Sequence, residues 1–327
     1  MKYKKLGQTE IQASVISLGT WVMGGDMWWG SDHDDNRYIN TIKHSIEHGI
    51  NTIDTATAYG KGHSETIVGK AIKGQRDKLY LASKAMADEL LPENAQQTVE
   101  ASLKRLGTDY IDIYYIHWPS PGISVAYNME ALEALRGKKL IRYIGVSNFT
   151  KRHLDIARTA GKVDVFQPPY SLLWRNIESE LLPYCIRNGI GVMTYSSLAM
   201  GLLSGKYDKD SKFEQGDIRE KMVALFMDGI YDKALEAVDG IKKISEKYGV
   251  STAQAALNWV FSQEGICTSI VGARTPEQLK ENIMAADFEI TCFDFDEMSK
   301  VCDELKTLVA DWDTMYYKKA EAFEIIN

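Results

Sequence analysis

The sequence contains few of the residues that cross-link secreted proteins or bind structural metals. Its 327 residues include only four cysteines, and no two of them are spaced as a CxxC pair. Zinc ribbons and thiol oxidoreductases depend on such pairs, so we expect reduced thiols in the core or at the surface. Neither a disulfide framework nor a thiolate metal site is predicted.

Long apolar segments and excess basic charge are also lacking. No run approaches the roughly 18 apolar residues of a membrane-spanning helix, and the first segment, MKYKKLGQTEIQAS, lacks the apolar core of a signal peptide. The formal net charge of −7 argues against nucleic acid or an anionic membrane, because both bind basic patches. We therefore expect a soluble, cytoplasmic protein with neither partner. The sequence leaves open whether it forms a homo-oligomer.

A Rossmann dinucleotide site is not supported either. The segment YGKGHSE offers Gly60 and Gly62 but no third glycine, so the G-x-G-x-x-G pattern is absent. Any dinucleotide must therefore bind in another way.

Strand-like and helix-like segments alternate along most of the chain. Helical periodicity is clearest at Asn36–His48, Ala95–Leu106, Ile177–Asn188 and Pro276–Ala285. Eight strands in alternation with helices predict an α/β fold, a single domain over residues 1–327 closed as a (β/α)8 TIM barrel. The predicted strands, short apolar runs of the kind buried on both faces, are Val15–Gly19, Thr52–Asp54, Leu79–Ser83, Ile111–His117, Tyr143–Val146, Val165–Gln167, Gly191–Tyr195 and Thr268–Val271.

Three segments fall outside this alternation. YKKLG and IQASVI flank polar turn residues and predict an N-terminal β-hairpin. Met200–Gly229, after the seventh strand, is rich in Gly, Lys, Asp and Met and indicates a long loop with a short helix. The chain after Asp294 has one helical pattern, Phe295–Leu308, and an aromatic tail. We expect this C-terminal helix and tail to lie over the rim as a lid or substrate wall.

Four chemically reactive residues follow or end the predicted strands. Asp54, Tyr59, Lys84 and His117 stand in the same relative place on neighbouring strands. In a barrel, that place is the C-terminal rim, where such enzymes carry out their chemistry. We predict that the four side chains share one site.

Together these groups can protonate a carbonyl oxygen as hydride reaches its carbon. A phenol with a pKa of about 10 is protonated at neutral pH, so Tyr59 can act as the acid. A neighbouring Lys84 cation favours the phenolate, and Asp54 can compensate the buried ammonium. His117 can orient the carbonyl or relay the proton.

An anion site is predicted where the eighth strand meets the next helix. In SIVGARTPEQLKEN, Thr275 is the expected N-cap, Pro276 the first helical residue and Gln278 the third, which matches a capping box. Free backbone N–H groups there attract phosphate, and Arg274 adds a planar guanidinium.

Taken together, the motifs resemble those of the aldo-keto reductase superfamily over nearly the whole chain. The segments occur in the family's order and spacing: GTWVMGG, NTIDTATAYGKGHSE, LASK, SLKRLGTDYIDIYYIHWP, IGVSNF, QPPYSLL, YSSLAMGLLSGKY and GARTPEQLKEN. The resemblance implies a barrel that binds NADP(H), with Asp54, Tyr59, Lys84 and His117 as catalytic tetrad. It implies a small-molecule carbonyl substrate.

The resemblance also implies the cofactor contacts. Ser147, Asn148 and Gln167 would hold the carboxamide, Tyr195 would stack on the nicotinamide, and Arg274 would bind the 2′-phosphate. The implied cofactor-binding residues are Thr20, Trp21, Asp54, Ser147, Asn148, Gln167, Tyr195, Ser196, Leu198, Gly201, Gly205, Lys206, Gly272, Arg274, Gln278, Glu281 and Asn282.

The resemblance implies that the loop Ser196–Gly205 covers the pyrophosphate of the cofactor, and the chain departs from the family pattern in this loop. Ser197, Ala199 and Met200 occupy the places of a proline, a glycine and an arginine. We expect a looser loop with one pyrophosphate contact fewer. Met86 replaces a glycine two residues after Lys84, which predicts a bulkier pocket wall.

Tryptophans gather in the segments expected at the rim, and indoles can stack on a sugar face or line a pocket. We favour a polyol, sugar-derived or other small hydroxy-carbonyl substrate. The predicted substrate-binding residues are Trp21, Trp28, Trp29, Tyr59, His117 and Trp118.

His44 and His48, four apart on a helix, resemble a metal-binding pair. We interpret them as a solvated helix face, and no metal site is predicted.

Two other functions stay open at this point. The chain could be a non-catalytic, NADPH-binding sensor or regulatory subunit of the same fold. It could also be a cofactor-independent lyase or isomerase with Lys84 as Schiff-base amine, although pairing with Asp54 would make that amine a poor nucleophile.

Overall fold

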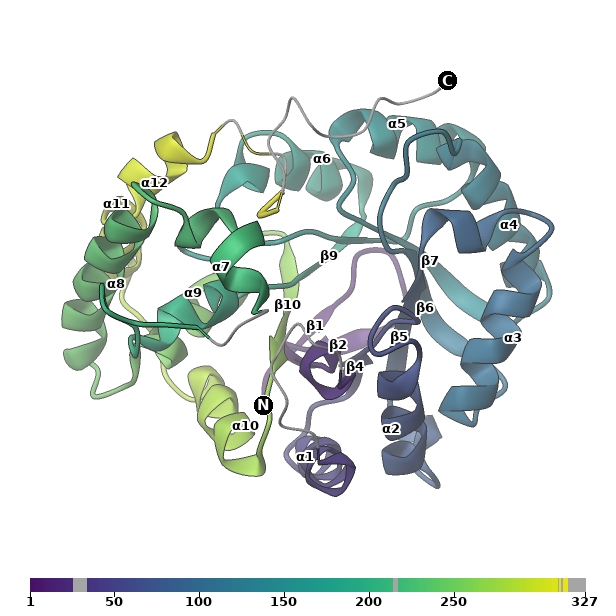
Figure 1. Cartoon of the computed structure of the whole chain (residues 1–327), viewed down its shortest axis with the longest axis horizontal. Helices are drawn as coiled ribbons and strands as arrows, with labels where there is room; N and C mark the ends of the chain where they lie inside the picture. The colour runs from purple at the N-terminus through teal and green to yellow at the C-terminus, as the bar shows by residue number, and fades with distance from the viewer. Residues whose placement is uncertain (26–33, 214–216, 311, 313, 317–327) are drawn as a thin grey trace.

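The protein is a closed barrel of eight parallel strands, described here from a computed structural model that defines residues 1–25, 34–213, 217–310, 312 and 314–316. The strands follow one another around the barrel in chain order, with β10 closing onto β3, and helices surround them (Figure 1). The predicted (β/α)8 TIM barrel is thereby confirmed. The strand bounds are β3 Ile16–Gly19, β4 Thr52–Asp54, β5 Tyr80–Ala85, β6 Ile111–Ile116, β7 Ile141–Ser147, β8 Val165–Gln167, β9 Gly191–Thr194 and β10 Ile266–Gly272.

The apolar strand sequences are explained by burial on two sides. Every residue of β6 is buried. Ile113 and Tyr115 belong to a cluster with Val165 and Met193, whereas the intervening Tyr114 belongs to the main core cluster. Alternate residues of a barrel strand face its interior and the surrounding helices, so neither face of such a strand needs polar residues.

The helices match the predicted pattern with two differences. The predicted helix Phe295–Leu308 is two helices, α11 and α12, separated at Val301 and Cys302. The predicted Ile177–Asn188 is a 3₁₀ turn, η5 (Asn176–Glu178), followed by α6. Pro183 explains this break, because proline is tolerated in the first turn of a helix but not in its interior. The helix bounds are α1 Asp35–Glu47, α2 His63–Ile72, α3 Ala95–Leu106, α4 Val125–Gly137, α5 Lys151–Ala160, α6 Leu181–Asn188, α7 Ile218–Met222, α8 Tyr231–Glu246, α9 Thr252–Ser262, α10 Pro276–Ile283, α11 Cys292–Lys300 and α12 Asp303–Leu308.

The predicted N-terminal hairpin closes the barrel at the end opposite the strand C-termini. β1 (Tyr3–Lys5) pairs antiparallel with β2 (Gln12–Ser14). Leu6 and Ile11 are fully buried and join the interior cluster of the barrel. Close packing of two glycines permits this: a Cβ on Gly7 would lie 2.3 Å from the backbone nitrogen of Gly191, at the start of β9. The open end of the barrel is therefore the rim where β3 to β10 end.

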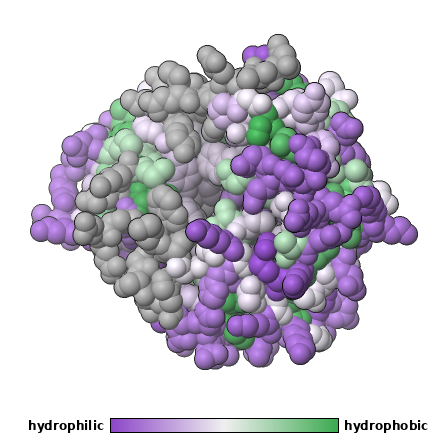
Figure 2. Space-filling view, turned by 45° about the vertical axis from the view of Figure 1, so that its right-hand side comes forward, coloured by the Kyte–Doolittle hydropathy of each residue, from purple (hydrophilic) through white to green (hydrophobic). Residues whose placement is uncertain are grey.

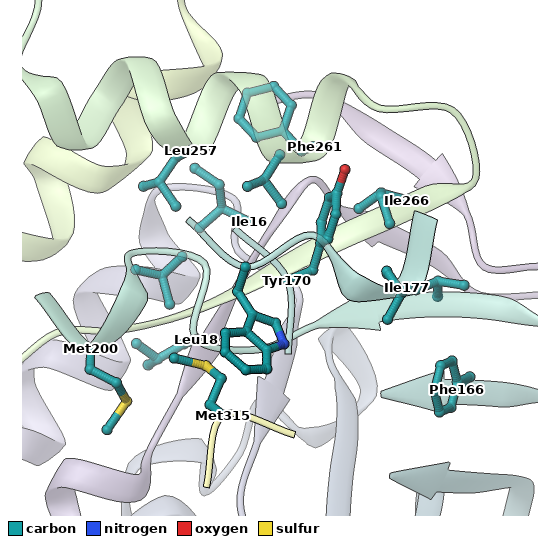
Figure 3. Close-up of a cluster of buried hydrophobic side chains, with 14 of the residues drawn as sticks. Ile16, Leu18, Phe166, Tyr170, Ile177, Met200, Leu257, Phe261, Ile266 and Met315 are labelled. Carbon is teal, nitrogen blue, oxygen red and sulfur yellow. The ribbon is translucent and has the colours of Figure 1, made fainter. Parts of the chain in front are cut away.

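The long segment after β9 and the C-terminal tail both lie at this rim. The segment contains η6 (Ala199–Ser204), α7 and η7 (Ala224–Phe226), as expected from its composition. The backbone N–H of Ala224 donates to the carbonyl of Met315 at 2.9 Å. Figure 3 shows Met315 in the same buried cluster as Leu18 and Met200. The tail is thus packed onto the barrel as far as the described residues extend.

The surface shown in Figure 2 is dominated by hydrophilic side chains, with hydrophobic ones in small separate groups. Among the described residues, no helix combines the length and the apolar character required to cross a bilayer.

Candidate active site

Three of the four predicted tetrad residues come from neighbouring strands. Asp54 ends β4 and Lys84 lies in β5, one residue deeper in the strand than predicted. His117 directly follows β6, and its backbone N–H donates to the carbonyl of Ala85 at 2.8 Å. Because parallel strands end at one rim, these residues reach the same end of the barrel.

Tyr59 is brought to the other three by the loop after β4. This loop packs against the loop after β3 so closely that a Cβ on Gly60 would lie 1.8 Å from the carbonyl oxygen of Gly24. Gly60 also has φ of 59°, which favours glycine. The Tyr59 ring consequently stacks beside Trp21, with ring centroids 6.0 Å apart.

Lys84 is fully buried and all three of its ammonium donors have partners. Its Nζ donates to Oδ1 of Asp54 at 2.5 Å, to the Thr55 carbonyl at 2.9 Å and to the Tyr59 hydroxyl at 3.3 Å. The expected ion pair with Asp54 and the expected contact with the phenol are both present. With no donor to spare and a carboxylate at hand, the amine is poorly suited to Schiff-base chemistry.

The pKa of Lys84 is lowered overall, because its acidic neighbours offset only part of the effect of burial. Burial lowers the pKa of Lys84, while the charge and hydrogen bond of Asp54, and the charge of the buried Glu65, act in the opposite direction. Asp54 is further held by Gln167, whose side-chain amide donates to Oδ2 at 2.8 Å. Each carboxylate oxygen therefore accepts one donor, and the geometry of the pair is fixed from both sides.

His117 is a neutral imidazole in this environment. Burial, and then the Lys84 charge, lower its pKa well below the ordinary value. Its Nδ1 is buried without a hydrogen-bond partner among the residues that the structure defines, which argues against a structural, hydrogen-bonded histidine. Its ring meets the Tyr59 ring edge-on at 5.7 Å between centroids. Phenol and imidazole thus converge where a carbonyl oxygen could accept from both.

A cavity of about 590 Å³ opens at this point, within the size range of small-molecule and cofactor sites. Lys84 lies beneath the cavity floor and is not part of its lining. The expected site residues that line the cavity are Thr20, Trp21, Asp54, Tyr59, His117, Trp118, Ser147, Asn148, Gln167, Tyr195, Ser196, Leu198, Gly201, Lys206, Gly272, Arg274 and Gln278.

The residues expected to hold a carboxamide form one hydrogen-bonded wall. Ser147 Oγ donates to the Gln167 carbonyl at 2.8 Å, and the Asn148 side-chain amide donates to the His117 carbonyl at 3.0 Å. The Tyr195 hydroxyl donates to Oδ1 of Asn148 at 2.7 Å. Burial raises the pKa of Tyr195 well above its ordinary value, so it remains a donor. The wall links β6, β7, β8 and β9 next to the tetrad.

The expected anion site contributes Gly272, Arg274 and Gln278 to the cavity lining. Thr275 caps α10 by accepting from the Gln278 N–H at 3.3 Å, and Pro276 opens the helix. The capping box differs from the prediction in one bond, because Oε1 of Gln278 accepts from the backbone of Arg274 at 2.9 Å. The Gln278 side chain reaches one residue further back and fixes the turn that carries Arg274.

Three of the residues expected to bind the cofactor lie outside the cavity lining. Gly205, Glu281 and Asn282 do not line the cavity. Asn282 is buried, and its amide donates to the Gly272 carbonyl at 3.5 Å, so it supports the end of β10. Trp28 and Trp29 lie outside the described residues.

The loop expected to cover the pyrophosphate has a strained backbone. Ala199 and Met200 have φ of 49° and 56°, in the left-handed region that normally favours glycine. Ala199 stands where the family resemblance expects a glycine. Its Cβ makes this backbone conformation unfavourable, whereas a glycine would adopt it without strain. Such outliers cost of order 1–3 kcal/mol each and tend to occur at functional sites. Met86 lines the cavity, in agreement with the expected bulkier wall.

Of the cavity residues that were not predicted from the sequence, two make contacts that bear on the site. Arg219 donates through Nη1 to the Tyr207 hydroxyl at 2.5 Å and to the Met200 carbonyl at 3.4 Å, and it pairs with Asp217 at 2.5 Å. Burial raises the pKa of Asp217, but the hydrogen bonds and charge of Arg219 outweigh it and lower the pKa overall. Arg274 makes a smaller contribution in the same direction. The guanidinium therefore lies beside the loop position where the family's arginine is missing.

The other is Tyr316, in the C-terminal tail, whose ring meets Trp118 edge-on at 5.9 Å between centroids. Both residues line the cavity. The sequence carries only weak signals for Arg219 and Tyr316. Arg219 is a single arginine in a charged loop, and Tyr316 is one of several aromatic residues in the tail.

Comparison with known proteins agrees with this geometry. The model of the aldo/keto reductase family matches residues 15–303. The chain is 41% identical to aldo-keto reductase YhdN of Bacillus subtilis, over 86% of this chain and 87% of that protein. It is 34% identical to the NADH-specific methylglyoxal reductase of Escherichia coli, over 94% and 100%. It is 31% identical to a probable voltage-gated potassium channel subunit beta of Arabidopsis thaliana, over 88% and 92%.

Solved structures give the same result. The glycerol dehydrogenase of Gluconobacter oxydans superposes with a TM-score of 0.82 at 32% identity, covering 94% of this chain and 95% of that one. An aldo/keto reductase of Klebsiella pneumoniae in complex with NADP and acetate superposes with a TM-score of 0.74 at 28% identity, again covering 94% and 95%.

Proposed function

The chain belongs to the aldo/keto reductase family and is an oxidoreductase that reduces carbonyl compounds. We propose that it reduces an aldehyde or ketone with NADPH while Tyr59 donates the proton. The observation that carries this proposal is the contact of the Lys84 ammonium with the Tyr59 hydroxyl at 3.3 Å, inside a buried ion pair with Asp54. The bound cofactor would supply hydride; the protein groups supply position, charge and a proton.

Each tetrad residue has a defined part in this proposal. The phenol gives its proton to the oxygen of the substrate, and the Lys84 cation stabilises the phenolate left behind. Asp54 keeps the cation compensated in a buried site. Neutral His117 can donate one N–H to the same oxygen and so orient the carbonyl.

The charge distribution in the cavity supports a phosphorylated cofactor. Lys206, Arg219 and Arg274 all line the cavity, and Arg274 directly precedes the N-cap of α10. Cations and free N–H groups together favour phosphate. We assign Arg274 to the 2′-phosphate, and hence NADPH over NADH, and Arg219 to the pyrophosphate in place of the missing loop arginine. One relative is named NADH-specific, so this preference needs its own measurement.

The cavity lining beside the tetrad is aromatic. Trp21, Trp118 and Tyr316 belong to it. We propose a small hydroxy-carbonyl or 1,2-dicarbonyl compound, which an indole face and the polar tetrad can bind together. Relatives named for methylglyoxal and glycerol act on compounds of this size.

A substrate panel followed by NADPH absorbance tests the proposal. We expect turnover of small aldehydes and ketones, a 10²–10⁴-fold loss of kcat in Tyr59→Phe as is usual for a general acid, and little change in NADPH affinity measured by tryptophan fluorescence. Tyr127→Phe is the matched control, because Tyr127 is 58% exposed on α4. Full activity of Tyr59→Phe would remove the proposed proton donor.

The non-catalytic alternative is kept because one relative is named as a channel subunit. Tight NADPH binding with no turnover across the whole panel would favour it. The paired and oriented tetrad favours catalysis.

A further inference from the structure

A cluster of metal-binding side chains lies far from the barrel mouth, on the last turn of α1. His44, Glu47 and His48 each offer one ligand atom, and these atoms all lie within 4.8 Å of one another. The two imidazoles are four residues apart, hence on one helix face, with ring centroids 4.0 Å apart. We propose that this cluster binds a divalent transition-metal cation of the zinc type.

The tautomer of His48 suits metal binding. Its Nδ1 lies 2.9 Å from the backbone carbonyl of His44. A carbonyl can only accept, so Nδ1 carries the proton and Nε2 has its lone pair directed away from the helix backbone. A histidine ligand held through its other ring nitrogen is the usual arrangement in metal sites.

The other two ligands are close to the separation that an ion requires. Nδ1 of His44 is 3.9 Å from Oε2 of Glu47. Two ligands at about 2.0–2.2 Å from one tetrahedral ion stand about 3.4 Å apart, so a small side-chain rotation suffices. Glu47 is 70% exposed and His44 29% exposed at the side chain, which leaves room for that rotation and for entry of the ion.

The electrostatic surroundings favour a cation. The cluster occupies the C-terminal end of α1, where the helix dipole gives a partial negative charge. Glu277, on the neighbouring α10, is near enough to His44 for the two to interact electrostatically, and Figure 1 shows α1 between α2 and α10. An ion here would therefore face acidic groups from two helices.

The chemistry of the ligands defines which ions fit. Imidazole and carboxylate together suit Zn²⁺, Ni²⁺ and Cu²⁺, whereas Mg²⁺ prefers oxygen ligands and bound water. The order H-x-x-E-H also occurs in zinc peptidases. Here it lies on the outer face of a barrel helix and not in the cavity, so we infer binding without hydrolysis.

Titration of the metal-free, full-length protein by calorimetry tests the site. We expect Zn²⁺ to bind and Mg²⁺ to give no comparable signal. Since even outer-shell partners contribute about 10–100-fold to metal affinity, His44→Gln and His48→Gln should each weaken Zn²⁺ binding by at least about 10-fold. Zn²⁺ should also raise the melting temperature of the wild type but not of the double variant.

His63→Gln is the matched control, because His63 is another partly exposed histidine. It lies on α2 and pairs at 2.9 Å with Asp35, at the opposite end of α1 from the cluster. It should bind Zn²⁺ like the wild type. The proposal is overturned if Zn²⁺ does not bind, if both α1 variants keep wild-type affinity, or if His63→Gln weakens binding as much as they do. Circular dichroism verifies that each variant is folded.

Discussion

The Gln167 amide donates to Oδ2 of Asp54 at 2.8 Å, directly opposite the Lys84 ammonium on Oδ1. A residue expected only to contact the cofactor therefore also fixes the buried carboxylate that compensates Lys84. The wall at the end of β8 and the ion pair between β4 and β5 form one connected network.

Gln167→Met should test this connection. The variant keeps the length of the side chain but leaves Oδ2 of Asp54 without a donor in a buried site. Losing a hydrogen bond to a charged group costs about 1.5–3 kcal/mol, so urea unfolding should show a loss of stability of that order. We also expect a lower kcat. Gln97→Met, at an exposed position on α3, should leave stability nearly unchanged; equal losses in the two variants would contradict the network.

Arg219→Leu should weaken cofactor binding without altering the chemical step. The guanidinium lines the cavity beside the Met200 carbonyl, and a charge-assisted contact to phosphate is usually worth at least a tenfold change in affinity. We expect the Kd for NADPH, measured by fluorescence, to rise about 10-fold or more, with kcat at saturation retained. Lys212→Met, an exposed position in the same segment, is the control for general loss of charge.

Arg274→Met should reduce the preference for the phosphorylated cofactor. If Arg274 holds the 2′-phosphate, the Kd for NADPH should rise about 10–100-fold while that for NADH changes little. Parallel titrations of both cofactors measure the ratio directly. A similar loss for both would assign Arg274 to a part that the two cofactors share.

Acid should destabilise the fold partly through His153. Its Nδ1 lies 3.1 Å from the Thr150 N–H, which it accepts in the capping box of α5, and burial lowers its pKa to about 4. Between about pH 6.5 and 4 the unfolded chain therefore binds a proton that the native state does not, so stability falls as pH falls through this window. His153→Gln retains a capping residue that does not titrate. The free energy of unfolding of this variant, measured with urea, should fall less between about pH 6.5 and 4 than that of the wild type.

The sequence predicted the barrel well because its strands carry local signals. β4 and β8 have the predicted bounds, Thr52–Asp54 and Val165–Gln167, and the others differ by a few residues at their ends. A barrel strand is covered by the barrel interior on one face and by helices on the other, so its sequence must be apolar on both faces. Strand ends depend on pairing with a neighbour, and Lys84 lies inside β5 because its backbone continues the ladder with β6 at Tyr115.

The cavity wall was harder to predict because it depends on contacts between distant segments. Arg219 reaches the Met200 carbonyl from another part of the same long loop, and Tyr316 meets Trp118 from the far end of the chain. The hydrophobic periodicity of the sequence, which reflects only neighbouring residues, predicts neither contact. Three members of the tetrad, Asp54, Lys84 and His117, could be recognised because they stand at or next to strand ends, which the barrel brings close together. Tyr59 lies in the loop after β4 and could be recognised from its place five residues after Asp54.

The C-terminal tail is fastened through its main chain. The Asn176 side-chain amide donates to the carbonyls of Val309 and Trp312, and the Ala224 N–H donates to that of Met315. These bonds do not depend on which side chain the tail presents at position 316. The cavity wall at Tyr316 can therefore change by single substitutions while its anchorage and the residues beneath stay the same. If this wall contacts the substrate as proposed, a family of such barrels could acquire new substrates without altering its scaffold.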